Sequence, residues 1–198
     1  MNFSQDEVKR LEEYCSIILK WNKSINLISK TTEKDIWNRH ILDSAQLINY
    51  IDKESSICDI GSGAGLPGIV LSIIGVKNTS LVESDIRKCV FLNLASKISN
   101  NKVNIINDRI ENLENMGAYD YITSRALADI PKLLSFSEII QPKIGLCILK
   151  GQNFREELKY ASLIYSFDSN VYPSVTNPDS CVIEIRNIRR KNENNRCS

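Results

Sequence analysis

The residues best suited to do chemistry lie in a glycine-rich segment, Ser56-Ile-Cys-Asp-Ile-Gly-Ser-Gly-Ala-Gly-Leu-Pro-Gly68. The segment reads as a buried strand that ends near Asp59, then a turn with alternating glycines, then the start of a helix. Glycine allows a sharp turn and lets the backbone approach a ligand, because it has no Cβ. Leu66 replaces the last glycine of the dinucleotide pattern G-x-G-x-x-G, and the Gly-Lys-Ser/Thr of a P-loop is absent. An ordinary turn or another nucleotide site would also fit such a cluster.

Further candidates follow the next predicted strands, whose carboxyl ends should meet where open α/β sheets bind ligands. Glu83 lies about 20 residues after the first glycine, and its carboxylate could accept hydrogen bonds from both hydroxyls of a ribose. Ile110 and Glu111 follow the third strand and could contact an adenine. Arg125 leaves the fourth strand and should point into the cleft. The alternatives are a helix-capping acid for Glu83 and a surface cation for Arg125.

The spacing of Asp59 and the alternating glycines resembles the first motif of methyltransferases that use S-adenosylmethionine (SAM). The fourth strand is not followed by the Asp/Asn-Pro-Pro-aromatic pattern typical of amino-group methylation on adenine or cytosine. A Pro-Cys nucleophile, which carbon-5 methylation of pyrimidines would need, is also missing. An acceptor that is already unprotonated and electron-rich, such as guanine N7, would need alignment with the methyl sulfonium and no base.

The elements that must position these residues alternate between strands and helices from residue 56 onward. This alternation predicts an α/β domain with βαβ units and a mainly parallel sheet. The last two strands have no helix between them and predict an antiparallel C-terminal hairpin. The predicted strands are 56–60, 79–83, 103–107, 120–124, 145–149, 165–172 and 180–188. This layout is that of the class I, Rossmann-like methyltransferases.

The first fifty or so residues predict helices packed on this domain. Ser4 and Glu7 form a capping-box signature ahead of apolar residues at helical spacing. A second helical pattern begins near Thr32. The predicted organisation is a helical extension at 1–52, a methyltransferase domain at 53–188, and a basic, disordered tail at 189–198.

Composition indicates an ordinary globular chain, with 42% hydrophobic residues, 25% charged residues and a net charge of +1. The near-neutral charge does not by itself indicate a nucleic-acid-binding protein. The cysteines are scattered and form no zinc-ligand or disulfide pattern, so we expect no metal. No apolar stretch is long enough to cross a membrane, and the start lacks the features of a secretion signal. We therefore expect a cytoplasmic protein that is not membrane-bound.

Several segments together resemble the bacterial 16S ribosomal RNA guanine-N7 methyltransferases, a family also called glucose-inhibited division protein B. The resemblance covers roughly residues 10–188, and the Leu-Pro-Gly after the glycines separates this family from other methyltransferases. The matching segments are Lys20-Trp-Asn-Lys-Ser-Ile-Asn-Leu27, Arg39-His-Ile-Leu-Asp-Ser44, Asp59-Ile-Gly-Ser-Gly-Ala-Gly-Leu-Pro-Gly68, Ser124-Arg-Ala126 and Leu149-Lys-Gly151.

The resemblance implies SAM as cofactor and transfer of a methyl group to a guanine N7 in the decoding-region loop of the small ribosomal subunit. The expected protein is a monomer whose partner is 16S rRNA. The cofactor contacts implied by matching positions are Gly61, Leu66, Ile110, Glu111 and Arg125. To these we add Asp59, Gly63 and Glu83 from the class I layout, and we expect Arg125 to be catalytic as well.

Competing interpretations remain for the function and for the only histidine. The chain could be a methyltransferase acting on a small molecule or a protein, or a nucleotide-binding module without catalysis. His40 could be a satisfied core residue, or, as the resemblance suggests, a neighbour of the cofactor or the rRNA.

Overall fold

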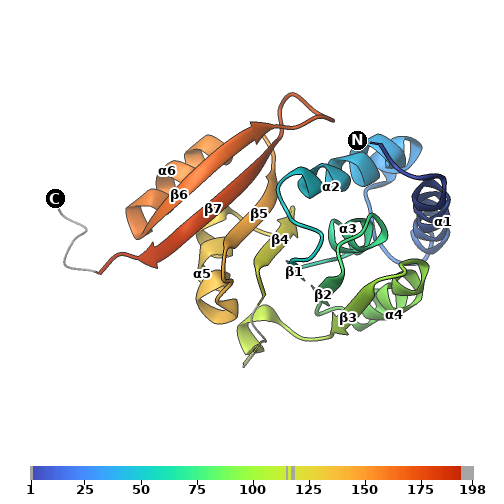
Figure 1. Cartoon of the computed structure of the whole chain (residues 1–198), viewed down its shortest axis with the longest axis horizontal. Helices are drawn as coiled ribbons and strands as arrows, with labels where there is room; N and C mark the ends of the chain where they lie inside the picture. Colours follow the sequence, from blue (N-terminus) through green and yellow to red (C-terminus); the bar gives the residue numbers. More distant parts are fainter. Residues whose placement is uncertain (1, 115, 117–118, 193–198) are drawn as a thin grey trace.

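The computed structural model describes residues 2–114, 116 and 119–192. Its centre is a twisted seven-stranded sheet with the order β3-β2-β1-β4-β5-β7-β6 (Figure 1). The strands are β1 (Ser56–Ile60), β2 (Asn78–Val82), β3 (Lys102–Ile106), β4 (Tyr121–Arg125), β5 (Gly145–Lys150), β6 (Tyr165–Pro173) and β7 (Cys181–Arg190). Strands β1 to β5 pair in parallel, whereas β7 is antiparallel to β5 and β6. The predicted parallel sheet with an antiparallel C-terminal hairpin is therefore confirmed.

The order of strands reverses between β1 and β4, which are neighbours in the sheet although β2 and β3 separate them in sequence. The side chains of these central strands are almost entirely buried, as expected for strands covered on both faces. Open α/β sheets bind ligands at the carboxyl ends of the strands beside such a reversal. The segments that follow Ile60 and Arg125 are thus the structural candidates for a site.

Helices on the two sides of the sheet divide the core into two clusters. The helices after β1 are α3 (Gly68–Ile73), α4 (Ile86–Ala95), α5 (Ile130–Ile140) and α6 (Phe154–Ile164). The first cluster gathers buried side chains from the N-terminal helices, α3 and α4, and the second gathers those from α5 and α6. Figure 1 shows the same division, with the N-terminal helices, α3 and α4 on one side of the view and α5 and α6 on the other.

The first helix, α1 (Gln5–Trp21), begins at the predicted capping box. Ser4 Oγ accepts a hydrogen bond from the Glu7 amide at 3.2 Å, and the Glu7 carboxylate accepts one from the Ser4 amide at 2.7 Å. These contacts satisfy two backbone donors that a helix start otherwise leaves unpaired. The helix buries Leu11, Tyr14 and Ile18 against the first core cluster.

The second helical segment is less regular than its sequence predicts. A π-helical turn carries His40 and Ile41, and both side chains are buried. Such π turns often occur at functional sites. The segment consists of a 3₁₀ turn (Lys30–Asp35), the π turn (Trp37–Leu42), α2 (Asp43–Ala45) and a second 3₁₀ turn (Gln46–Asn49).

The predicted start of the tail at residue 189 is wrong, because β7 continues through Arg190. This strand end is held by pairing with Tyr165 and by an ion pair of 3.2 Å between the Arg190 and Glu138 side chains. The remainder of the predicted tail from residue 193 lies outside the described residues. In the part of the chain that the structure covers, no helix is long and apolar enough to span a membrane.

Candidate functional site

A cavity of about 400 Å³ lies at the carboxyl ends of β1 to β4, as the strand order predicts. We call it the glycine-loop cavity. Among the residues predicted from sequence to contact the cofactor, Gly61, Gly63, Glu83, Ile110 and Glu111 line it, whereas Asp59, Leu66 and Arg125 do not. Its lining residues are Gly61, Gly63, Val82, Glu83, Ser84, Lys88, Asp108, Arg109, Ile110, Glu111, Ala126, Leu127 and Phe136.

Glu83 connects the glycine turn to the start of α4. One of its carboxylate oxygens accepts a hydrogen bond from the Gly63 amide at 2.9 Å, and the other accepts one from the Asp85 amide at 2.8 Å. A carboxylate offers about four lone-pair sites, so these contacts leave acceptor capacity for a ligand. Glu83 is only 8% exposed, and the turn holds its carboxylate at the cavity wall.

The two glycines that line the cavity both have positive φ angles, which glycine adopts without steric cost. At Gly61 a Cβ would collide with the Leu127 side chain, which covers it. At Gly63 the nearest atom to an added Cβ is the Gly61 carbonyl oxygen at 3.9 Å, so no protein group fills that space. The backbone at Gly63 is therefore open to the cavity.

Asp59 lies beneath the glycine turn and does not reach the cavity. Its carboxylate is fully buried and accepts hydrogen bonds from the Thr123 hydroxyl at 3.0 Å and the Gly68 amide at 3.2 Å. Burial raises the pKa of Asp59 from 3.8 to about 7. The sequence-based assignment of Asp59 as a cofactor contact therefore needs correction, because its position makes it a residue that ties β1, β4 and α3 together under the turn.

Leu66 and Ile110 are both largely buried apolar residues. Leu66 packs in the first core cluster behind the turn and is 7% exposed, so its side chain supports the turn from inside. Ile110 begins a 3₁₀ turn after β3 and lines the cavity. The neighbouring Glu111 is exposed and forms an ion pair of 3.2 Å with Lys132 of α5.

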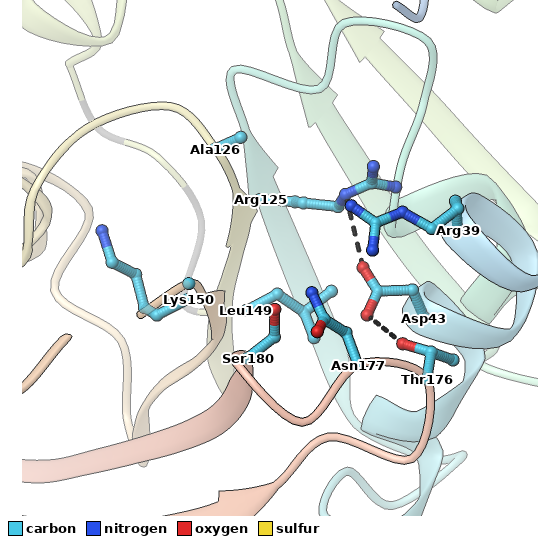
Figure 2. A pocket seen from close by; sticks show the side chains of 10 residues that line it. Arg39, Asp43, Arg125, Ala126, Leu149, Lys150, Thr176, Asn177 and Ser180 are labelled. Atoms are coloured by element: carbon cyan, nitrogen blue, oxygen red, sulfur yellow. Dashed lines mark hydrogen bonds and ion pairs between the residues drawn. The ribbon is translucent and has the colours of Figure 1, made fainter. Parts of the chain in front are cut away.

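Arg125 lines a second, adjacent cavity of about 190 Å³, shown in Figure 2, which we call the arginine cavity. Ala126 lines both cavities, so the two meet just after β4. The wall is assembled from the N-terminal extension, the ends of β4 and β5, and the connection between β6 and β7. Its residues are Arg39, Asp43, Arg125, Ala126, Leu149, Lys150, Gly151, Thr176, Asn177 and Ser180.

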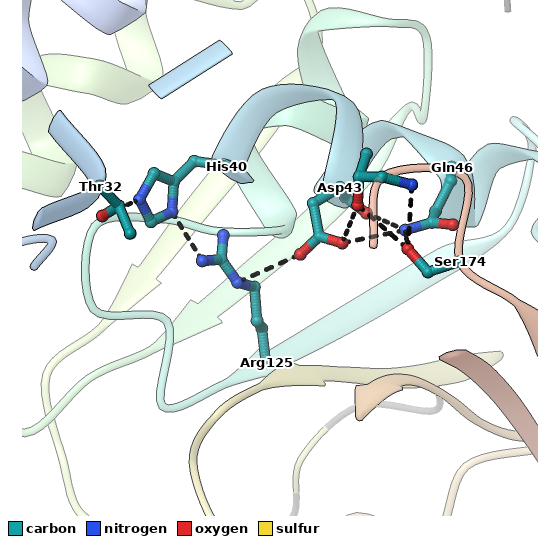
Figure 3. A network of polar contacts seen from close by, with 7 residues as sticks. Thr32, His40, Asp43, Gln46, Arg125 and Ser174 are labelled. Carbon is teal, nitrogen blue, oxygen red and sulfur yellow. Dashed lines mark hydrogen bonds and ion pairs between the residues drawn. The ribbon is translucent and has the colours of Figure 1, made fainter. Parts of the chain in front are cut away.

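The N-terminal extension holds the Arg125 guanidinium from two sides (Figure 3). Nη2 lies 2.6 Å from His40 Nδ1, and Nε lies 3.5 Å from Asp43 Oδ2. Arginine can only donate, so His40 Nδ1 must accept, and the His40 proton sits on Nε2, which donates to the Thr32 hydroxyl at 2.7 Å. Burial, followed by the charge of Arg125, lowers the pKa of His40 from 6.5 to about 4. His40 is therefore a neutral acceptor within the site.

The same extension also binds the connection between β6 and β7. Asp43 Oδ1 accepts a hydrogen bond from the Thr176 hydroxyl at 2.9 Å. Gln46 donates to the Ser174 hydroxyl at 3.1 Å and accepts from the Val175 amide at 3.0 Å. Segments more than a hundred residues apart in sequence thus form one wall around Arg125. Sequence spacing could not reveal this pairing, although Asp43 lies within one of the segments that carried the family resemblance.

We expect replacement of His40 by leucine to lower the free energy of unfolding by about 1–3 kcal/mol, because it leaves a buried Arg125 donor without its acceptor. His40→Asn should recover part of the loss, since the Asn oxygen can replace Nδ1. A neutral native histidine loses stability relative to the unfolded chain as pH falls from 6.5 toward 4, because the unfolded histidine gains a proton. Urea titrations across this range should therefore show the wild-type advantage over His40→Asn shrinking as pH falls. An advantage that stays constant would contradict a neutral His40.

Comparison with known proteins agrees with this architecture. The family model described as rRNA small subunit methyltransferase G matches residues 7–183. A protein of Orientia tsutsugamushi (strain Boryong) named ribosomal RNA small subunit methyltransferase G is 46% identical over 186 residues, which are 93% of each chain. A protein of the same name from Rickettsia prowazekii is 44% identical over 191 residues, covering 96% of this chain and 99% of that one.

The chain belongs to the rRNA small subunit methyltransferase G family.

Solved structures place this family member in the class I SAM-dependent methyltransferase fold. M. jannaschii TYW2, solved in complex with AdoMet, superposes with a TM-score of 0.59 at 16% identity, covering 85% of this chain and 80% of that one. A TehB-like SAM-dependent methyltransferase from Corynebacterium glutamicum gives a TM-score of 0.58 at 15% identity, covering 91% and 100%. The fold predicted from sequence is confirmed. The glycine-loop cavity occupies the strand ends at which this fold class was expected to hold its cofactor.

Proposed function

We propose that this member of the rRNA small subunit methyltransferase G family transfers a methyl group from SAM to N7 of a guanine in 16S rRNA, within the decoding-region loop of the small subunit. The observation that carries the proposal is the pair of cavities that meet at Ala126. One cavity has the glycine turn and a carboxylate suited to a nucleoside, and the other has arginines suited to RNA. A methyl donor and its acceptor must lie next to each other, as the two cavities do.

The glycine-loop cavity fits SAM by the chemistry of its lining. Glu83 would accept hydrogen bonds from the ribose hydroxyls, while its existing bonds to backbone amides fix the carboxylate in place. Ile110 offers an apolar surface for the adenine, with Glu111 beside it. Gly63 lets the backbone approach the ligand, and Gly61 supplies the positive φ angle that the turn needs. Asp59 and Leu66 would act indirectly, by shaping the turn from below.

For methyl transfer, the chain must align the methyl donor with the acceptor nitrogen and exclude water from the space between them. When bound, SAM supplies a methyl group activated by its sulfonium. Guanine N7 has an unshared electron pair at neutral pH, so the chain needs no general base to prepare it. Holding the reactants in line can lower the barrier by about 7–11 kcal/mol. Arg125, fixed by His40 and Asp43 at the point where the cavities meet, is the residue we propose to orient the reactants.

No bound metal enters this proposal. Among the described residues, no cluster of His, Cys, Asp or Glu side chains has the arrangement of a metal site. We also propose that the protein works in the cytoplasm as a monomer, since residues of a single chain line both cavities. The small ribosomal subunit is its proposed partner.

Replacement of Gly63 by alanine should raise the dissociation constant of SAM about tenfold or more, which corresponds to about 1.4 kcal/mol. The added methyl group would occupy the open space above the turn. The left-handed backbone at this position, with φ of +56°, should cost a further 1–2 kcal/mol of stability, approximately. Calorimetry with SAM measures the first effect and urea denaturation the second. Gly151→Ala is the control, because its Cβ meets nothing within 4 Å and it lines the other cavity. Equal SAM affinities in the two variants would contradict a ligand above Gly63.

Transfer of labelled methyl groups from SAM to purified ribosomal subunits tests the proposed function. The subunits should come from cells that lack this gene, so that the target guanine is unmodified. We expect incorporation into 16S rRNA of the small subunit and none into the large subunit. Incorporation into a small molecule or a protein instead would indicate that this methyltransferase acts on a different class of substrate. SAM binding without any turnover would favour a non-catalytic module.

A further inference from the structure

We propose that Arg39 and Arg125 together form an anion site in the arginine cavity, and that this site holds a backbone phosphate of the substrate RNA beside the acceptor guanine. The identification of the anion as an RNA phosphate rests on the proposed function. The site itself rests on the charges, the unpaired donor and the exposure described below.

The arginine cavity carries a positive charge that nearby carboxylates do not balance. Lys150 is compensated by Glu157, whose carboxylate lies 2.6 Å away, and Arg125 by Asp43 at 3.5 Å. Within the described part of the chain, Arg39 forms no ion pair with a carboxylate. Figure 2 shows the Arg39 and Arg125 side chains extending into the same space, where their like charges repel. Burial is the main cause that lowers the pKa of Arg125, Asp43 and Tyr14 oppose it, and Arg39 adds a smaller lowering effect. An anion between the two arginines would remove this repulsion.

Arg125 also has a hydrogen-bond donor that nothing in the described residues accepts. Its Nη1 is buried without a partner, whereas Nη2 donates to His40 and Nε faces Asp43. Buried donors are nearly always paired in native proteins, so the unpaired Nη1 of a residue that lines this cavity leaves the guanidinium with a donor that an added acceptor could satisfy. The planar guanidinium fork matches the oxygens of a phosphate.

The position of Arg39 favours RNA over the carboxylate of SAM as the source of the anion. Arg39 is solvent-exposed, comes from the N-terminal extension and lines only the arginine cavity. The residues suited to hold the nucleoside of SAM line the other cavity, where Glu83 is located. Arg39 thus presents its charge to a ligand that arrives from solvent, while Arg125 reaches the border between the cavities.

The test compares Arg39→Gln with Lys9→Gln, a control that removes the same charge from an exposed residue of α1 lining neither cavity. With small subunits as substrate, Arg39→Gln should raise KM about tenfold near 0.1 M salt and leave kcat and SAM affinity unchanged. Loss of one phosphate contact should also reduce the slope of log KM against log salt by about 0.7–0.9. Lys9→Gln should behave as the wild type in each measurement.

Several results would overturn this inference. An unchanged KM and salt slope in Arg39→Gln would show that Arg39 does not bind the RNA. Weaker SAM binding with an unchanged salt slope would show that Arg39 and Arg125 bind the SAM carboxylate and not an RNA phosphate. Binding of a short fluorescent single-stranded RNA provides a readout that needs no catalysis. If wild-type protein methylates no subunit, the proposed function fails, and weaker RNA binding by Arg39→Gln than by Lys9→Gln would still support the anion site.

Discussion

Replacement of Arg125 by lysine should lower kcat/KM for methylation of small-subunit rRNA roughly 10- to 150-fold, although the charge is preserved. The guanidinium uses Nε and Nη2 to contact Asp43 and His40, and its Nη1 is buried without a partner among the described residues. Lysine has one nitrogen and cannot maintain this fork. Losing one charge-assisted hydrogen bond costs about 1.5–3 kcal/mol, which gives the stated range if the bond is formed in the transition state.

Steady-state methylation of purified small subunits measures this effect, and SAM affinity is measured separately by calorimetry. Arg87→Lys is the matched control, because Arg87 is an exposed arginine of α4 that pairs only with Asp85 among the described residues and lines neither cavity. Wild-type activity in Arg125→Lys would show that Arg125 contributes only its positive charge.

Replacement of Glu83 by glutamine should raise the dissociation constant of SAM roughly 10- to 150-fold, by the same range of about 1.5–3 kcal/mol. The carboxylate accepts hydrogen bonds from the amides of Gly63 and Asp85 and has acceptor capacity toward the ribose. A glutamine amide would place an NH₂ group against one of these N–H donors. The glycine turn would lose a hydrogen bond, and the contact with the ligand would weaken as well. Once the variant is saturated with SAM, its kcat should fall much less than its affinity.

Calorimetry at several SAM concentrations and a steady-state assay at saturating SAM separate the two effects. Glu114→Gln removes the same charge from an exposed position outside both cavities and should bind SAM as the wild type does. Unchanged affinity in Glu83→Gln would leave Glu83 with the role of a capping acid beside α4.

The sequence predicted those parts of the molecule that local patterns determine. Alternating apolar strands and helices gave the parallel sheet, and each predicted strand lies within about two residues of the observed one. Ser4 and Glu7 predicted the start of α1, because a capping box depends only on neighbouring residues. Glu83 and the glycine turn could be brought together from sequence because both follow parallel strands that end at the same edge of the sheet.

The parts that could not be predicted depend on contacts between distant segments. Asp59 belongs to the glycine motif, but only the pairing of β1 with β4 shows that its carboxylate accepts a hydrogen bond from Thr123 beneath the turn. The structure shows His40 buried with both ring nitrogens paired, as a satisfied core residue would be, and its contact with Arg125 could not be read from sequence. The arginine cavity is built from four separate segments of the chain, and no spacing rule relates Asp43 to Thr176.

The central claim is the transfer of a methyl group to a guanine N7 of 16S rRNA, and mapping of N7-methylguanine tests it most directly. Reduction of an N7-methylated guanine followed by treatment with aniline cleaves the RNA chain at that nucleotide. We predict one such cleavage in the decoding-region loop of 16S rRNA from cells with the gene, its loss when the gene is deleted, and its return with the wild-type chain but only weakly with Arg125→Lys. An identical cleavage pattern with and without the gene would contradict the account.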